Sequence, residues 1–76
     1  MEHVAVGMRV KLLIADMDND ENGIERKIPV GTRGRVFARD ESLRDGPYFH
    51  VAFDNGGWLI FYPKEFELHL ELVPIS

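Results

Sequence analysis

The Asn55-Gly56 pair lies between two alternating apolar runs and constrains the fold more than any other feature of this chain. The runs cover residues 48–54 and 58–62, and Asn-Gly between such runs is the strongest short-range signal of a β-hairpin. Asparagine and glycine tolerate the positive φ angles that a twist-matched hairpin turn requires. The sequence therefore predicts two antiparallel strands joined by this turn, and residues 30–36 predict a third strand beside them.

Alternation along these three strands divides their side chains between two faces, because successive residues of a strand point to opposite sides. The residues predicted to face the core are Val36, Ala38, Phe49, Val51, Phe53, Leu59 and Phe61. The residues predicted to face outward are Arg35, Phe37, Arg39, Tyr48, His50, Ala52, Trp58, Ile60 and Tyr62. Gly31 and Gly34 predict a bend or a close backbone approach where the second of the five strands begins.

Two further strands are predicted at residues 7–14 and 67–72, with alternating apolar residues facing the core. These inward residues are Met8, Val10, Leu12 and Ile14 in the first strand and Leu68, Leu70 and Leu72 in the last. Residues 15–27 and 40–46 are polar and are predicted as loops, and residues 63–66 fit a single 3₁₀ turn. The prediction is an all-β, five-stranded barrel. A ferredoxin-like α+β fold is set aside because no window of about ten residues has a helical period.

Length and composition limit the classes of protein further. The 76 residues allow a single domain, and the absence of cysteine excludes disulfides and thiolate metal sites. The formal net charge of −4 disfavours binding that depends on neutralising phosphates. No apolar run approaches the roughly 20 residues that cross a bilayer, and the first residues lack a signal-peptide pattern. We therefore expect a cytoplasmic protein.

Three groups of residues carry a resemblance to a known family. They are Pro29, Gly31, Thr32, Gly34 and Val36; then Val51, Phe53, Asp54, Asn55 and Gly56; then Leu59, Phe61 and Pro63. With Gly7-x-x-Val10 before them, these residues resemble SH3-like barrels of the KOW and Tudor-like kind, and most closely small bacterial and phage domains of unassigned function. The resemblance implies an SH3-like barrel over residues 1–76 and says little about activity, because the matching residues are turn and core residues. KOW domains often contact RNA or ribosome-associated proteins through basic loops, whereas the two long loops of this chain are acidic.

A possible cation site lies in the first polar segment. Asp18, Asp20 and Asn22, followed by Gly23, match the first six positions of a calcium-binding loop. The acid needed at the twelfth position is replaced by Pro29, and no flanking helices are predicted. A solvated acidic loop is therefore the favoured interpretation, and no metal or other cofactor is expected.

The outward side of the predicted sheet is the strongest candidate for a binding site. Phe37, Tyr48, His50, Trp58, Ile60 and Tyr62 fall on that side. Adjacent strands lie about 4.8 Å apart, so these side chains can form one patch, and aromatic patches commonly mark protein interfaces. A protein partner or a homodimer would use this patch for docking. The alternatives are cross-strand packing without a partner and coverage by residues 16–27.

A second candidate surface is basic. Arg33, Arg35, Arg39 and Arg44 cluster around the second strand, near Phe37, Tyr48 and Trp58. Arginines beside stacking aromatic rings hold single-stranded nucleic acids in other proteins. Nearby acidic residues make a solvated, mixed-charge edge the simpler interpretation, so nucleic acid is the less favoured partner.

Catalysis is not expected. Ser42 lies in a predicted loop, Ser76 is the last residue, and His3, His50 and His69 lack the spacing of a catalytic triad or a metal site. A barrel of this size has a filled interior and no deep pocket. The sequence therefore predicts a binding module rather than an enzyme, with no membrane partner.

Overall fold

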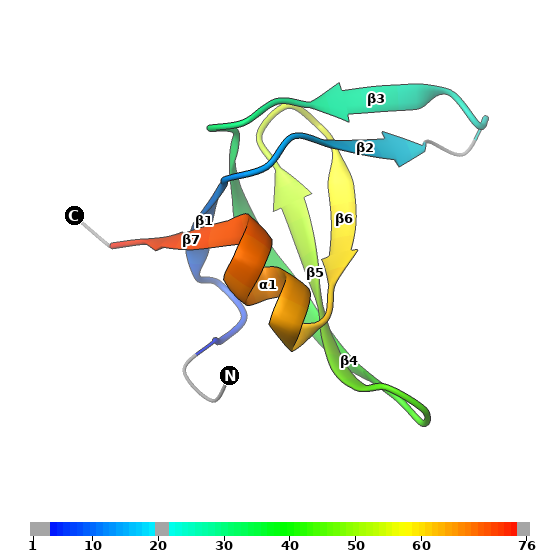
Figure 1. The fold of residues 1–76 in the computed structure, drawn as a ribbon, viewed down its shortest axis with the longest axis vertical. Helices are drawn as coiled ribbons and strands as arrows, with labels where there is room; N and C mark the ends of the chain where they lie inside the picture. The colour runs from blue at the N-terminus through cyan, green and yellow to red at the C-terminus, as the bar shows by residue number, and fades with distance from the viewer. Residues whose placement is uncertain (1–3, 20–21, 75–76) are drawn as a thin grey trace.

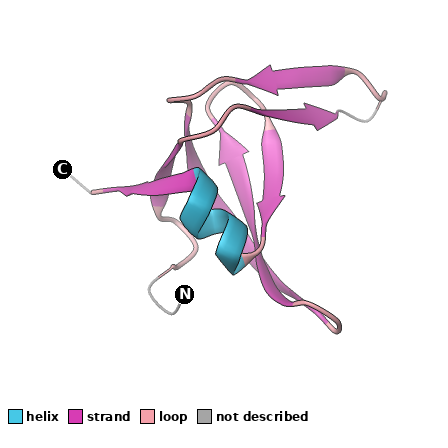
Figure 2. Ribbon diagram, in the orientation of Figure 1, coloured by secondary structure: helices cyan, strands magenta, loops and turns pink. Residues whose placement is uncertain are grey.

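The computed structural model describes residues 4–19 and 22–74, which form seven strands and one short helix (Figure 1). In chain order the elements are β1 (Arg9–Leu12), β2 (Asp16–Asn19), β3 (Glu25–Ile28), β4 (Arg33–Ser42), β5 (Gly46–Phe53), β6 (Trp58–Phe61), α1 (Pro63–His69) and β7 (Leu70–Val73). Strands predominate throughout the chain, as Figure 2 shows, so the predicted all-β class is confirmed in outline.

Five strands form one antiparallel sheet in the order β6-β5-β4-β1-β7, and β2 and β3 form a separate two-stranded hairpin. The larger sheet is curved, and α1 lies on one side of it, between the edge strands β6 and β7 that it connects (Figure 1). The β2–β3 hairpin projects from one end of the molecule, and the far end of the β4–β5 hairpin extends past the other strands of the sheet. One side of the sheet is therefore covered by the helix, and the other side is available to solvent.

The core lies between the sheet and α1. Its buried apolar residues are Val4, Val10, Leu12, Ile28, Val36, Phe49, Val51, Phe53, Phe61, Phe66 and Leu70. Phe66 of α1 packs edge-on against Phe49 and Phe61, with ring centroids 5.5 and 6.4 Å apart. Full burial of each such side chain contributes roughly 1.5–3 kcal/mol. The inward residues predicted on β5 are confirmed, as is Phe61 on β6, while Leu59 is partly buried.

The predicted hairpin at Asn55-Gly56 is confirmed, with a longer turn than a two-residue connection. The Gly56 N–H donates to the Phe53 carbonyl at 2.9 Å, and the Phe53 N–H donates to the Gly57 carbonyl at 2.8 Å. Only Gly56 in this turn has a positive φ angle, of 92°. This pattern is a type I turn followed by a left-handed glycine, which is the usual three-residue hairpin loop.

The close backbone approach predicted near Gly34 is also confirmed. A Cβ atom at this position would lie 2.7 Å from the Ala52 carbonyl oxygen and 3.2 Å from the Phe53 Cα. Gly34 pairs with Val10 on β1 and with Phe53 on β5, so it lies in the middle of the sheet. Only glycine lets β4 and β5 come this close.

Residues 63–69 form an α-helix, so the predicted 3₁₀ turn and the predicted start of the last strand at residue 67 are both wrong. Pro63 occupies the first turn, and the Glu65 side chain accepts a hydrogen bond from the Tyr62 N–H at 3.3 Å. Both features are typical of a helix start. Phe66 and Leu70 are buried at a spacing of four residues, whereas Leu68 is 62% exposed rather than inward.

The segment after β1 is a hairpin rather than the predicted loop. Asp18 pairs with Arg26 and Met17 with Lys27 across β2 and β3. β1 ends at Leu12, and Ile14, which was predicted to face the core, is half exposed. Backbone pairing forms this hairpin without the apolar alternation that identifies a half-buried strand in a sequence.

A β-bulge changes the predicted faces of β4. Val36 pairs with Val51 and Ala38 pairs with His50, so Phe37 has no partner of its own on β5. The extra residue shifts the alternation. Ala38 therefore lies on the outward side, and Arg39 lies opposite Phe49, so both predicted orientations are wrong. The loop predicted at 40–46 is present but shorter, at 43–45, since β4 continues to Ser42 and β5 begins at Gly46.

Candidate functional site

The six residues predicted as an outward aromatic patch lie together on the side of the sheet away from the core. This surface, the aromatic face, consists of Phe37, Tyr48, His50, Trp58, Ile60 and Tyr62. His50 is directly opposite Ile60 across β5 and β6, and Ala52 is opposite Trp58. The predicted juxtaposition of these side chains is therefore confirmed.

His50 lies at the centre of the aromatic face. Its ring centroid is 5.6 Å from that of Phe37, 5.4 Å from that of Tyr48 and 5.6 Å from that of Trp58. The His50 and Trp58 rings are stacked, with an interplanar angle of 26°. Only 13% of the His50 side chain is exposed, so the neighbouring rings hold it in place.

The His50 ring has one polar contact within the part of the chain that the structure describes. Its Nε2 lies 2.9 Å from an Asp40 carboxylate oxygen, and its buried Nδ1 has no hydrogen-bond partner. Asp40 is on β4, which the bulge at Phe37 brings into register with this part of β5. The bond to Asp40 fixes the orientation of the imidazole between the aromatic rings.

The outer part of the aromatic face is open to solvent. Phe37, Trp58 and Ile60 are 46%, 49% and 48% exposed. The β2–β3 hairpin reaches this region through Asp18, whose carboxylate accepts the Trp58 backbone N–H at 2.8 Å. The described residues of this hairpin, 16–19 and 22–27, leave the indole half exposed, so they do not cover the patch. Exposed aromatic and aliphatic side chains gathered on one side of a sheet are typical of interaction sites.

Two of the four candidate arginines lie on the same side of the sheet as the aromatic face. Arg35 pairs with Ala52, and Arg33 lies two residues before it on β4. Arg39 is turned away by the bulge and contacts Glu41 at 3.3 Å, and Arg44 lies in the turn between β4 and β5. The four arginines therefore do not form one surface.

Sequence reasoning missed two cations that complete a basic surface. Arg9 and Lys11 of β1 lie directly opposite Arg35 and Arg33 of β4. These four residues, Arg9, Lys11, Arg33 and Arg35, are called the basic patch below. Their alternation was visible in the sequence, but the pairing of β1 with β4, which joins residues far apart in the chain, was not.

The calcium-loop candidate is not formed in the predicted way. Asp18 is in strand β2, and its carboxylate is occupied by the Trp58 N–H. Asp20 lies outside the described residues. In residues 4–19 and 22–74, no three acidic, histidine or cysteine side chains gather where they could share a metal ion.

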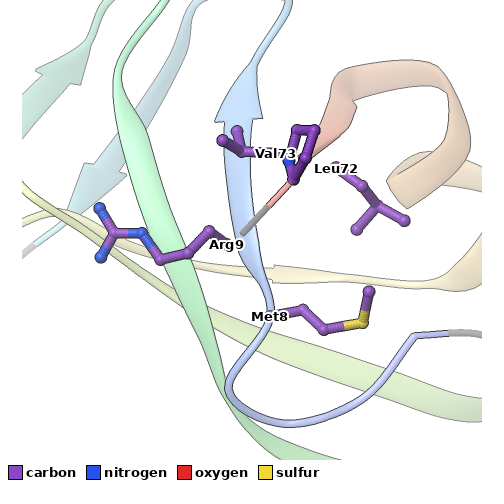
Figure 3. Close-up of a pocket in the computed structure, with 5 residues that line it drawn as sticks. Met8, Arg9, Leu72 and Val73 are labelled. Atoms are coloured by element: carbon purple, nitrogen blue, oxygen red, sulfur yellow. The ribbon is translucent and has the colours of Figure 1, made fainter. Parts of the chain in front are cut away.

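A groove of about 330 Å³ lies where β1 and β7 pair (Figure 3). It is lined by Met8, Arg9, Leu72, Val73 and Pro74. The side chains in this lining include one charged group, that of Arg9, and no acid, hydroxyl or imidazole. The groove therefore lacks the groups that general acid–base or nucleophilic catalysis requires.

No family model, no curated protein and no solved structure matches this chain. Among residues 4–19 and 22–74, no helix is long and apolar enough to cross a membrane. The seven residues of α1 compare with the roughly 20 that a membrane-crossing helix needs.

Proposed function

We propose that this chain is an SH3-like barrel that acts as a non-catalytic binding module and docks a protein through its aromatic face. The sheet order β6-β5-β4-β1-β7, with a hairpin after the first strand and a short helix before the last, supports the SH3-like assignment. In this arrangement the first and last strands are neighbours, and the helix closes the curved sheet at one end (Figure 1).

The half-exposed positions of Phe37, Trp58 and Ile60 carry the proposal. These side chains stand on the paired strands β4, β5 and β6, and ring contacts through His50 hold two of them in place. A partner therefore meets a surface that is already ordered, so binding loses little side-chain entropy. Buried aromatic anchors of this kind commonly dominate the energy of protein interfaces.

Association measured with Trp58→Ala tests this function. Self-association is followed by sedimentation velocity over a range of concentrations, and binding to other proteins by parallel pull-downs from a native, nuclease-treated lysate. We expect Trp58→Ala to lose association that the wild-type chain and Leu68→Ala retain, because Leu68 is exposed on α1 away from the aromatic face. Equal behaviour of all three proteins would contradict the proposal.

A second candidate function, single-stranded nucleic-acid binding, is favoured by the position of the basic patch beside the aromatic rings. This surface contains two of the four predicted arginines, Arg33 and Arg35, together with Arg9 and Lys11. The other two predicted arginines, Arg39 and Arg44, lie away from it. Its signature is an affinity that falls steeply as the salt concentration rises. The test measures how much single-stranded oligonucleotide the protein retains on a filter as the salt concentration is raised. No retention at low salt, or retention that stays the same as salt rises, would argue against this function.

A further inference from the structure

The outward side of the sheet is divided into a basic half and an aromatic half. One row of paired residues crosses both halves, from Arg9 on β1 through Arg35 and Ala52 to Trp58 on β6. Phe37, two residues along β4 from Arg35, contacts Trp58 with ring centroids 6.0 Å apart. Arg35, Phe37 and Trp58 thus surround Ala52, whose side chain is a single methyl group.

The basic half carries positive charge that the fold does not neutralise. Arg9 faces Arg35 and Lys11 faces Arg33 in register, and like charges in such pairs repel. Two acids approach: Asp54 lies 3.4 Å from Arg9, and Glu71 lies 3.5 Å from Lys11.

Arg33 and Arg35 are both exposed, and neither has an acidic partner in residues 4–19 and 22–74. The sheet therefore holds two guanidinium groups side by side in an arrangement that is unfavourable until an anion arrives.

We propose that the protein bound by the aromatic face presents an extended acidic segment whose carboxylates bind Arg33 and Arg35. This inference rests on the proposed function. β4 and β6 are two strand spacings apart, about 10 Å, which three residues of an extended chain also span. An apolar side chain of the partner could therefore pack on Phe37 and Trp58 while a carboxylate two or three residues away in the same segment binds the arginines. Arginine binds carboxylates through paired hydrogen bonds, which favours this anion geometrically.

The charges favour an acidic peptide over a nucleic acid. A single strand presents a phosphate at every nucleotide, whereas the surface offers two unpaired cations within a chain of net charge −4. Acidic groups also border this side, since Asp54 is held by Arg9 and Asp40 by His50. Two cations match one or two carboxylates more closely than a continuous phosphate backbone.

A second copy of the chain is a poorer match. Its acidic hairpin carries Asp16, Asp18 and Glu25 on described positions, but Arg26 lies opposite Asp18 and Lys27 lies opposite Met17. The hairpin therefore presents mixed charge to a neighbour. A separate acidic segment has no such cations to repel the basic patch.

Selection from a displayed random-peptide library against the immobilised full chain tests the inference. We expect enriched peptides to carry Asp or Glu within two or three residues of an aromatic or aliphatic side chain. The Arg33→Gln/Arg35→Gln double variant should weaken binding of such a peptide by about tenfold per arginine, since hydrogen bonds between charged groups are that strong. The matched Arg39→Gln/Arg44→Gln variant has the same net charge and should bind like the wild type.

The possible outcomes separate the two proposals. The acidic-segment inference would be overturned if the enriched peptides need Trp58 but contain no acid, or if they bind both double variants equally. The proposed function of the aromatic face would survive either result. Peptide binding that is unaffected by Trp58→Ala would overturn the proposed function as well. Binding of mixed-sequence single-stranded oligonucleotides that the Arg33→Gln/Arg35→Gln variant abolishes, with no peptide enriched, would assign the surface to nucleic acid. Concentration-dependent self-association lost in that variant would assign it to a second copy.

Both double variants should remain folded. Gln at positions 33 and 35 removes the repulsion from Lys11 and Arg9, so thermal unfolding is expected at or above the wild-type temperature. An Arg33→Gln/Arg35→Gln protein that unfolds at a markedly lower temperature would show that these arginines support the sheet instead, and would overturn the inference.

Discussion

Replacement of Gly34 by alanine should destabilise the protein through a clash between two strands. The added methyl group would lie 2.7 Å from the Ala52 carbonyl oxygen, 3.0 Å from the Phe53 Cδ1 and 3.2 Å from the Phe53 Cα. Two of these three atoms belong to the backbone of β5, so no side-chain rotation relieves the contact. β4 and β5 must move apart, at the point where β4 also pairs with β1.

The magnitude follows from typical costs of overpacking. Forcing a methyl group into a packed interior costs about 1–3 kcal/mol, and a backbone clash in a central strand belongs at the upper end of that range. A chain of 76 residues has a total stability of roughly 4–11 kcal/mol. We therefore expect Gly34→Ala to lower the free energy of unfolding by about 3 kcal/mol, which at an m-value of about 1 kcal/mol/M shifts the urea midpoint by about 3 M.

Urea unfolding followed by far-UV circular dichroism measures this shift, with Gly57→Ala as the matched control. A Cβ at Gly57 would meet Ile28 Cδ1 at 2.6 Å, Ile28 Cγ1 at 2.9 Å and Asn55 Oδ1 at 3.1 Å, all of them side-chain atoms rather than strand backbone. The control should therefore lose less stability than Gly34→Ala. If Gly34→Ala unfolds at the wild-type midpoint, β4 and β5 lie too far apart at Gly34 for a Cβ to clash with the β5 backbone.

Four substitutions and one deletion test the helix, the aromatic face and the bulge. Leu70→Ala should lower the free energy of unfolding in urea by about 2–4 kcal/mol and Leu68→Ala by less than about 0.5 kcal/mol, because only Leu70 is buried. Equal losses would indicate that these residues form a strand rather than the end of α1. Trp58→Ala should leave the unfolding free energy within about 1.5 kcal/mol of wild type, since the indole is half exposed, and a larger loss would place it in the core. His50→Phe keeps a ring, removes the unpartnered Nδ1 and breaks the contact to Asp40, whose carboxylate is 60% exposed. Stability should therefore stay within about 1 kcal/mol of wild type, and a larger loss would reveal a strong His50–Asp40 bond. Deletion of Phe37 should leave the far-UV circular dichroism spectrum unchanged, because Val36 and Ala38 keep their partners on β5. Loss of the β-sheet signal would show that the sheet needs the bulge for its curvature.

Local signals in the sequence predicted the central part of the sheet. Asn55-Gly56 determines the hairpin because both its residues and the hydrogen bonds of its turn lie within a few positions of each other. From that turn, simple alternation places Phe53 inward and Trp58 outward, and the structure agrees. Since the turn also sets the register of β5 against β6, the ring contacts between those two strands were predictable as well.

The helix was missed because two patterns overlap in the same residues. Leu68, Leu70 and Leu72 alternate as in a strand, whereas Phe66 and Leu70 are spaced as on one face of a helix. The choice between them depends on the packing of Phe66 against Phe49, which lies in a distant part of the sequence. Such tertiary contacts override local pattern, and a sequence window does not contain them.

The basic patch was only half predicted for a related reason. Arg33 and Arg35 were visible as neighbours on one strand, but their proximity to Arg9 and Lys11 depends on the pairing of β1 with β4. The β2–β3 hairpin was missed because its stabilising contacts also come from elsewhere: the Asn55 side chain donates to the Lys27 carbonyl, and Asp18 accepts from Trp58. Its own residues show no apolar alternation.

The bulge at Phe37 connects these observations to function. In a regular strand Val36 and Ala38 would share the inward face, and Phe37 would be the only outward residue between Arg35 and Arg39. With the extra residue, Phe37 reaches both His50 and Trp58, and Asp40 comes into reach of the His50 imidazole. The same shift turns Arg39 away from Arg35, so the positive charge on this side is confined to the end of β4 nearest β1. A single unpaired residue thus brings Asp40 to the His50 imidazole and removes Arg39 from this side, so that Arg33 and Arg35 are the β4 arginines beside the aromatic rings.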